Sequence, residues 1–189
     1  IEQQVLDEHI SDFYICSLSC RSIIYKGMFV AEQLTAFYPD LLDERFVSSF
    51  AVIHQRYSTN TFPTWRAAQP FRMAAHNGEI NTIKGNTNWM RSHGTRASSK
   101  IFEKDNTDIF PLIEPGASDS MALDLVLESL VRAGRPLPVA QCLMIPDSWS
   151  KKPNIPKKLQ ELYSYCNCVM EPWDGPAAIA AADGIWAIA

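Results

Sequence analysis

The spacing of apolar residues in the C-terminal half of the chain predicts three helices. The clearest one follows Ser118, where apolar residues recur at helical spacing until Gly134. Ser118 is suited to cap the start of this helix and Gly134 to end it. Residues 139–144 predict a second, shorter helix or buried run, and residues 155–170 predict a third helix.

Short runs of β-branched and aromatic residues predict strands in the N-terminal half. Residues 13–19 and 22–25 have the pattern of a hairpin. Residues 46–57 are apolar on both faces near their centre, which is typical of a buried strand. Residues 71–76 predict a strand that closes at Asn77-Gly78, a pair that favours a tight turn.

The remaining elements complete an α+β pattern. Residues 31–37 predict a short helix and residues 81–90 a helix with a polar face. Two small-residue runs, 176–181 and 185–188, flank Asp183-Gly184 and predict a closing hairpin. Strands at both ends with helices between them indicate helices stacked on antiparallel sheet. No repeat or linker divides the chain, so residues 1–189 are predicted to belong to a single domain.

Composition narrows the class of protein. A chain of 189 residues with 47% hydrophobic and 20% charged residues is typical of a soluble globular domain with its own core. The net charge of −4 argues against non-specific nucleic-acid binding. No apolar run approaches the roughly 18 residues of a membrane helix. The five cysteines have irregular spacing, which favours reduced, buried thiols over disulfides or a metal site.

Three places carry candidate chemistry, and each has a structural alternative. Arg56, in a strand-like run, can bind a substrate carboxylate with its guanidinium fork or pair with a protein acid. Asn77-Gly78 can be a plain turn, or can offer an amide side chain and a backbone N–H to an oxyanion. Asp119 lies in the first turn of the helix after Ser118, where an acid commonly just stabilises the helix N-terminus.

Taken together, the motifs along the chain are more informative than any one alone. They are residues 13–19, 25–28, 37–41, His54-Gln55-Arg56-Tyr57-Ser58-Thr59-Asn60-Thr61-Phe62-Pro63, His76-Asn77-Gly78-Glu79-Ile80-Asn81-Thr82, Gly85-Asn86-x-Asn88-Trp89-Met90, Ser118-Asp119-Ser120 and Met170-Glu171-Pro172-Trp173-Asp174-Gly175-Pro176. This ordered series closely resembles the glutamine amidotransferase domain of the glutamate synthase large subunit. The resemblance runs from about Phe13 to the C-terminus and lacks the start of that domain.

The resemblance implies a class II amidotransferase with the N-terminal-nucleophile hydrolase fold, a sandwich of antiparallel sheets covered by helices and here incomplete. In this family the nucleophile is the cysteine at the mature N-terminus, and its own α-amine serves as the base. That cysteine would lie upstream of Ile1, and none of the five cysteines present matches it. The chain alone is therefore expected to be an inactive fragment.

The resemblance also implies roles for six residues. Arg56 would hold the α-carboxylate of glutamine and Asp119 its α-ammonium, while Asn77 and Gly78 would form the oxyanion hole. Two further residues would line the pocket beside Arg56: Ser58 and Thr59. No metal ligand is implied. One departure from the family pattern is Ala117, which stands where a second glycine is common before Ser-Asp-Ser and would strain the loop if that position needs a positive φ.

In the family's reaction, the ammonia released from glutamine travels inside the protein to a flavin-containing synthase domain of the same polypeptide. There 2-oxoglutarate is converted to glutamate, which makes the enzyme part of ammonia assimilation and glutamate biosynthesis. The resemblance implies no cofactor in this segment, and FMN and an iron–sulfur cluster elsewhere in the full enzyme. It implies a small reductase subunit or ferredoxin as a further partner, and a cytoplasmic or plastid location.

Two alternatives remain open from the sequence. The chain could belong to another class II amidotransferase, such as those that make glucosamine phosphate, asparagine or phosphoribosylamine. The motif at residues 171–176 and the extension Ile80-Asn81-Thr82 favour glutamate synthase. The chain could also be a non-catalytic module that binds glutamine, although Arg56, Asn77, Gly78 and Asp119 are all present.

Overall fold

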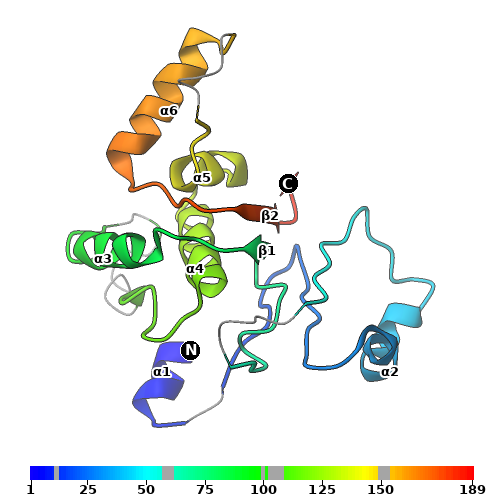
Figure 1. Ribbon diagram of the computed structural model, residues 1–189. Helices are drawn as coiled ribbons and strands as arrows, with labels where there is room; N and C mark the ends of the chain where they lie inside the picture. The colour runs from blue at the N-terminus through cyan, green and yellow to red at the C-terminus, as the bar shows by residue number, and fades with distance from the viewer. Residues whose placement is uncertain (11–12, 57–61, 99–100, 102–108, 149–153) are drawn as a thin grey trace. The chain divides into compact units, whose positions relative to one another are not determined.

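The computed structural model describes residues 1–10, 13–56, 62–98, 101, 109–148 and 154–189 (Figure 1). The chain divides into a first unit, formed by Ile1–His76 with Ile179–Ala187 and Ala189, and a second unit, formed by Asn77–Ala178 with Ile188. The helices and strands of the described residues, in chain order, are α1 (Glu2–Asp7), the 3-10 helix η1 (Ala31–Gln33), α2 (Leu34–Phe37), the 3-10 helix η2 (Pro39–Leu42), β1 (Ala74–Gly78), α3 (Ile83–Gly94), α4 (Asp119–Arg132), α5 (Leu137–Met144), α6 (Lys157–Val169), β2 (Ala177–Ala182) and β3 (Ala187–Ile188).

The strands form one small sheet in the order β1-β2-β3. The N–H of Ala182 donates to the carbonyl of Met73 at 2.8 Å, and the N–H of Asn81 donates to the carbonyl of Asp174 at 2.8 Å. The register therefore runs forward along one strand and backward along the other, as in an antiparallel ladder. Helices together with a small antiparallel sheet confirm the α+β class.

The predicted helices of the second unit are confirmed, and α4 supplies much of its core. Ser118 caps α4 with its hydroxyl oxygen, which accepts the N–H of Met121 at 3.2 Å. Gly134 follows the last turn with a φ of +97°, a conformation in which glycine ends a helix without strain. Six fully buried apolar side chains of this unit come from three successive helices: Ala122, Val126, Leu127, Leu137, Ala140 and Cys166.

The helix predicted over residues 31–37 is confirmed as the pair η1 and α2, and Pro39 opens η2 instead of ending the helical region. The helix predicted over 81–90 is confirmed as α3, shifted toward the C-terminus. The closing hairpin is confirmed as β2 and β3, and Gly184 provides its positive φ of +83°. These elements could be predicted because the turn and helix-capping residues that define them lie close by in the sequence.

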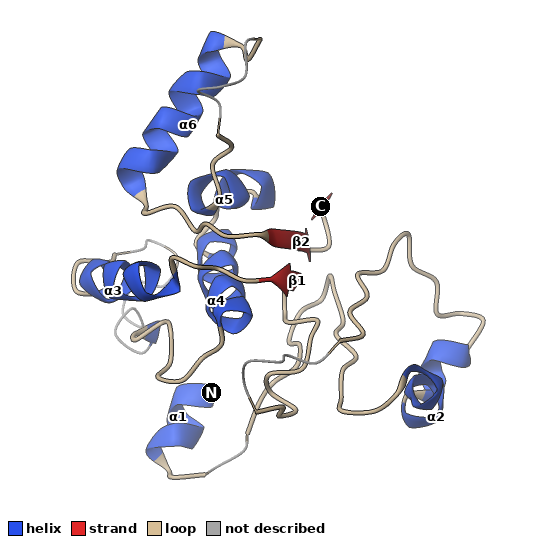
Figure 2. Cartoon of the chain, in the orientation of Figure 1, coloured by secondary structure: helices blue, strands red, loops and turns tan. Residues whose placement is uncertain are grey.

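The N-terminal hairpin predicted over residues 13–25 is wrong. These residues form neither helix nor strand, as the long tan loops in Figure 2 show. Their backbone groups bond to side chains: Ile15 donates to Glu2 Oε1 at 3.0 Å, and its carbonyl accepts Arg72 Nη2 at 2.9 Å. Ile24 likewise donates to Ser17 Oγ at 3.2 Å. A β-type pattern becomes a strand only where another strand supplies the partners.

The buried strand predicted over residues 46–57 is also wrong for its described part, residues 46–56. Val47 is 85% exposed and Ile53 is 83% exposed. The N–H of Phe46 donates back to the carbonyl of Asp43 at 2.8 Å, in a turn. An apolar run shows that a segment is suited to burial but does not supply the surface that would bury it.

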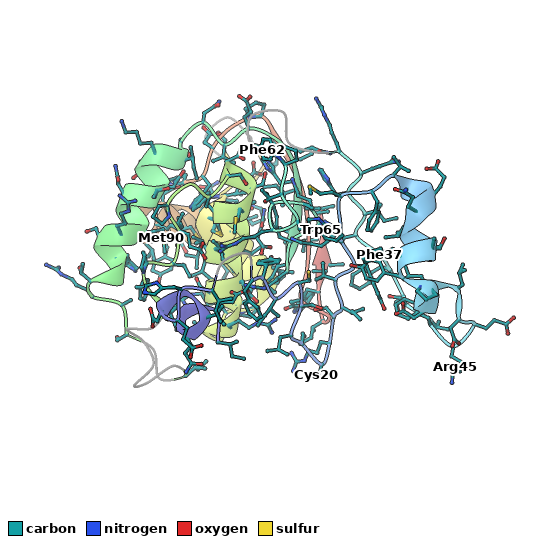
Figure 3. All side chains as sticks on the ribbon, turned by 90° about the horizontal axis from the view of Figure 1, so that it is seen from below. Cys20, Phe37, Arg45, Phe62, Trp65 and Met90 are labelled. Atoms are coloured by element: carbon teal, nitrogen blue, oxygen red, sulfur yellow. The ribbon has the colours of Figure 1, made fainter. Side chains whose placement is uncertain are left out.

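A cluster of aromatic rings joins α2 to loop residues of the first unit. The ring centroids of Phe37 and Trp65, both labelled in Figure 3, lie 5.8 Å apart, and Phe29 contacts both. A hydrogen bond to Asp40 raises the pKa of the exposed Tyr25 hydroxyl to about 12. These ring contacts pack α2 against loop residues that precede and follow it.

The cysteines are free, as predicted, but the expectation that they are buried holds for only one. Cys166 is buried, whereas Cys20 and Cys168 are exposed. Burial raises the pKa of the Cys166 thiol, and of the Cys142 thiol as well. No helix in the described part of the chain combines the length and apolarity needed to cross a membrane.

We expect a thiol-alkylating reagent at neutral pH to label Cys20 and Cys168 well before Cys166. The reactive species is the thiolate, and both burial and a raised pKa reduce the amount of accessible thiolate at Cys166. Limited alkylation followed by peptide mass spectrometry measures the order. Equal labelling of Cys166 and Cys168, neighbours on α6, would contradict the burial described for the helix.

Candidate functional site

Asn77 and Gly78 end β1 at the surface of the second unit. Both residues are exposed, and Gly78 has a φ of +114°, which L-residues rarely adopt. A Cβ at Gly78 would lie 1.9 Å from the carbonyl oxygen of Pro176. The predicted tight turn is wrong, because the chain continues in the ladder and Glu79 donates to the carbonyl of Pro176 at 3.2 Å. Asn77 and Gly78, called the Asn-Gly corner below, thus end β1 with their backbone in close contact with Pro176.

The same close approach recurs one step along the ladder. A Cβ at Gly175 would lie 1.9 Å from the carbonyl oxygen of Glu79. Trp173, which is 3% exposed, donates its backbone N–H to the carbonyl of Met144 at the end of α5. The segment opposite the Asn-Gly corner is therefore fixed on one side by the ladder and on the other by a buried aromatic anchor.

Asp119 lies within hydrogen-bonding distance of the chain that leaves this corner. Its Oδ2 accepts the N–H of Ile80 at 3.0 Å, and its Oδ1 accepts the N–H of Ser120 at 2.7 Å. Ser118 already caps the helix, so Asp119 does more than cap. Its carboxylate is half-buried and joins the first turn of α4 to a residue only two positions after Gly78. A fixed negative charge beside a strand corner is suited to bind a cation.

The loop before Asp119 is not strained at Ala117. The positive φ belongs to Gly116, at +84°, where a Cβ would meet nothing within 4 Å. Among the described residues, His9 is the one non-glycine with a positive φ. The single glycine is therefore enough for this turn, and alanine at the next position is compatible with the helix start that carries Asp119.

Arg56 belongs to the first unit and is exposed, in a segment with neither helix nor strand. The prediction of a strand-borne arginine is thus wrong as to its local structure. The second unit brings together Asn77, Gly78 and Asp119. The two remaining predicted pocket residues, Ser58 and Thr59, lie outside the described residues.

The sequence interpretation missed Gln69, which braces β1 from the first unit. Its Oε1 accepts the N–H of His76 at 2.7 Å, and its Nε2 donates to the carbonyl of His76 at 3.0 Å. The amide side chain thus takes the place of a neighbouring strand next to Asn77. Gln69 stands in a loop before Pro70 and carries no local signal of this role.

A second omission is a hydrogen-bonded polar pair at the start of α3, formed by the buried Asn86 and the half-buried Thr82. Asn86 is 1% exposed, and its side chain contacts Thr82 and the backbone of residues 171 and 172. A buried amide in a helix normally has several hydrogen-bond partners. The motif Gly85-Asn86 at a helix start was the available signal, but its partners lie about ninety residues away in sequence.

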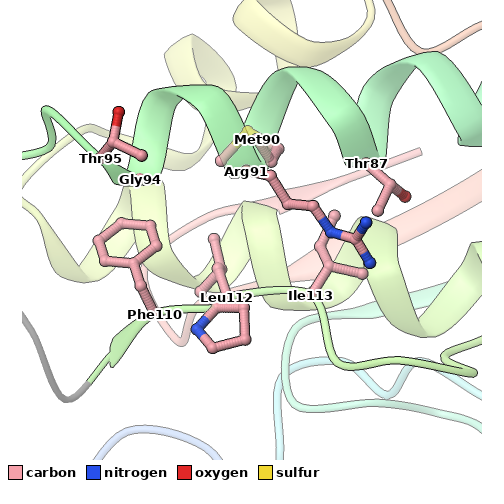
Figure 4. A pocket seen from close by; sticks show the side chains of 9 residues that line it. Thr87, Met90, Arg91, Gly94, Thr95, Phe110, Leu112 and Ile113 are labelled. Atoms are coloured by element: carbon pink, nitrogen blue, oxygen red, sulfur yellow. The ribbon is translucent and has the colours of Figure 1, made fainter.

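A cavity of about 270 Å³ lies elsewhere in the second unit, between α3 and residues 110–113 (Figure 4). Met90, Phe110 and Ile113 line it, together with Arg91 and others. None of the predicted site residues lines this cavity. The candidate site is therefore the exposed corner at the end of β1, and not this mostly apolar groove.

Comparison with known sequences shows the family of the chain. The profile of the family described as "Glutamine amidotransferases class-II" matches residues 1–189. The chain belongs to this family. It is 60% identical over 188 residues to "Glutamate synthase [NADPH] large chain" of Azospirillum brasilense, covering 100% of this chain and 12% of that protein.

Two further relatives show how widely the similarity extends. "Glutamate synthase [NADPH] large chain" of Bacillus subtilis is 47% identical over 173 residues, 92% of this chain and 11% of that protein. "Ferredoxin-dependent glutamate synthase, chloroplastic" of Spinacia oleracea is 46% identical over 177 residues, again 92% of this chain and 11% of that protein. The chain thus spans about a tenth of the length of these curated relatives.

Proposed function

We propose that this chain is the ammonia-generating glutaminase part of a glutamate synthase and that residues 1–189 belong to a single amidotransferase domain. The similarity to NADPH- and ferredoxin-dependent glutamate synthases favours this assignment over other class II amidotransferases. The fold within which we place it is the sandwich of N-terminal-nucleophile hydrolases, to which the small antiparallel sheet and the helices of the described residues would contribute.

The observation that carries the proposal is the hydrogen bond between Asp119 and the N–H of Ile80. It brings a carboxylate beside the chain that leaves the Asn77-Gly78 corner. We assign Asp119 to the α-ammonium of glutamine, and the Asn77 side chain and Gly78 N–H to the oxyanion. Arg56 would hold the α-carboxylate. Ser58 and Thr59 complete the proposed pocket.

In the proposed reaction, a cysteine thiolate at the mature N-terminus of the longer polypeptide attacks the side-chain amide carbon of glutamine. The negative charge then develops on the carbonyl oxygen, where two donors at the corner lower the barrier. The C–N bond breaks, the amide nitrogen takes up a proton and leaves as ammonia, and water cleaves the resulting thioester to give glutamate.

The ammonia would pass to a flavin-containing synthase domain of the same polypeptide, which converts 2-oxoglutarate to glutamate. The described residues contain no group of three or more His, Cys, Asp or Glu that could hold a metal ion. We assign the iron–sulfur cluster and FMN to other parts of the polypeptide. A small reductase subunit or ferredoxin would supply electrons, in the cytoplasm or, in a photosynthetic eukaryote, in the plastid.

Replacing Arg56 with alanine in the longer polypeptide tests the proposed function. We expect the KM for glutamine to rise about tenfold, since an exposed charge-assisted contact contributes about 1 to 1.5 kcal/mol. Activity with ammonium in place of glutamine should not change, because ammonium bypasses the amide-cleaving site. Steady-state kinetics with each nitrogen donor measures both.

Arg45→Ala is the matched control, because Arg45 is an exposed arginine of the same unit that pairs with Asp43 at the surface. Its removal should leave both activities at wild-type values. A wild-type polypeptide that used ammonium but not glutamine would overturn the proposed function. An unchanged KM for glutamine in Arg56→Ala would overturn only the role given to Arg56.

A further inference from the structure

The side chain of Asn86 directs all its described hydrogen bonds toward one distant segment and one neighbour. Its Nδ2 donates to the carbonyl of Glu171 at 3.2 Å and to the carbonyl of Pro172 at 3.1 Å. Its Oδ1 accepts the hydroxyl of Thr82 at 2.7 Å. At 1% exposure, the amide is withdrawn from water and depends on these protein partners.

Thr82 extends the same contact. Its hydroxyl oxygen accepts the backbone N–H of Asp174 at 2.9 Å while the hydroxyl donates to Asn86. Two polar side chains at the start of α3 therefore bond to three backbone groups, on residues 171, 172 and 174. Gly175 and Pro176 follow this segment. The side chains of Asn86 and Thr82 supply the hydrogen bonds that a neighbouring strand would make.

The segment leads directly to the Asn-Gly corner. The carbonyl of Asp174 accepts the N–H of Asn81, and the carbonyl of Pro176 accepts the N–H of Glu79. The Pro176 oxygen also lies where a Cβ of Gly78 would be. Any shift of residues 171–174 is thus transmitted through two hydrogen bonds and one close backbone contact to Gly78.

We propose that Asn86, together with Thr82, is a positioning residue for the oxyanion hole. The pair holds residues 171–174 in register and so orients the N–H of Gly78, without touching glutamine itself. This inference rests on the proposed function, since it assigns Asn86 a part in the amide-cleaving step. Neither residue is among the substrate-binding or oxyanion groups named above.

Asn86→Asp in the longer polypeptide tests the proposal with almost no change of volume. A carboxylate keeps an acceptor for Thr82 but puts an oxygen, instead of a donor, against the carbonyls of Glu171 and Pro172. The segment must then move away. We expect kcat with glutamine to fall about tenfold, with the KM for glutamine within about twofold of wild type, since the hole stabilises the transition state and not the bound substrate.

Asn167→Asp is the matched control, because Asn167 is an exposed asparagine on α6. It makes the same chemical change without removing a buried donor, and should leave kcat and KM unchanged. Activity with ammonium should be unaffected in both variants. Wild-type polypeptide without glutamine-dependent activity would contradict the proposed function itself, and is therefore distinguishable from a failure of the role of Asn86.

A second pair of variants keeps the proposal testable if Asn86→Asp does not fold. Thr82→Val removes the hydroxyl and keeps the shape of the side chain, whereas Thr82→Ser keeps the hydroxyl and removes the methyl group. We expect kcat of the valine variant to be about fivefold below the wild-type value and kcat of the serine variant to stay close to the wild-type value. The proposal is overturned if kcat stays at the wild-type value in Asn86→Asp. It is also overturned if kcat falls and the KM for glutamine rises by a similar factor. It is also overturned if Thr82→Ser is as impaired as Thr82→Val.

Discussion

Alanine at Gly78 is expected to lower glutamine-dependent turnover of the longer polypeptide by at least about 100-fold. The added Cβ would lie 1.9 Å from the carbonyl oxygen of Pro176, whereas ordinary contacts begin at 3.4 Å. Backbone would have to move by roughly 1.5 Å, and a misplacement of about 1 Å can cost 100-fold in rate. The φ of +114° adds strain of about 1 to 3 kcal/mol. Kinetics with glutamine and with ammonium, alongside thermal unfolding, measure the effect.

Gly134→Ala separates backbone strain from the displacement of the corner. Gly134 also has a positive φ, +97°, but the nearest atom to its Cβ would be the flexible end of Ile101, at 3.2 Å. This variant should lose about 1 kcal/mol of stability and keep its glutamine-dependent kcat. If Gly78→Ala retained full turnover while Gly134→Ala behaved as expected, Gly78 could not be part of the oxyanion hole.

Asp119 offers the second large effect, and two substitutions divide its two roles. Asp119→Asn keeps an oxygen that can accept the N–H of Ile80 but removes the charge. We expect the KM for glutamine to rise about 100-fold, which corresponds to about 2.7 kcal/mol for a lost charge-assisted contact. The unfolding temperature should stay close to that of the wild type. Kinetics and calorimetry on the same preparation test both statements.

Asp119→Ala should show the same loss of glutamine binding and, in addition, lower stability by about 1 to 2 kcal/mol, because the N–H of Ile80 loses its partner. The proposed contact with the α-ammonium would be excluded if the KM for glutamine in Asp119→Asn stayed within twofold of wild type and Asp119→Ala changed only stability. Asp119 would then only join α4 to the strand.

The helices show why part of the fold was predictable. Ser118, the apolar positions of α4 and Gly134 lie within one stretch of seventeen residues, and their capping and packing signals act over one or two helical turns. The closing hairpin around Asp183-Gly184 is local in the same sense. The incorrect predictions at residues 13–25 and 46–56 share the opposite property, because a strand exists only through partners far away in sequence.

The candidate site divides in the same way. Sequence motifs alone identified four candidate site residues, and the roles given to them stay predictions: Asn77, Gly78, Asp119 and Arg56. The local structure at Asn77-Gly78 was predicted wrongly: the pair favours a turn in isolation, but the chain continues along the ladder, where Glu79 and Asn81 donate to the carbonyls of Pro176 and Asp174. The structural roles of Gln69 and Asn86 were not predicted, because an amide side chain that bonds to backbone can come from any loop or helix that tertiary structure brings near.

By itself the sequence determined the amidotransferase family, the helices α3 to α6 and the closing hairpin, since each depends on residue types or on contacts within a few turns. Tertiary structure alone decided which apolar runs pair as strands, that Gly78 must lack a side chain because Pro176 lies against it, and that Asp119 reaches the N–H of Ile80. Those outcomes join residues between about forty and one hundred positions apart. Hydrogen-bond partners and steric neighbours at that separation are set by the packed chain and not by local conformational preference.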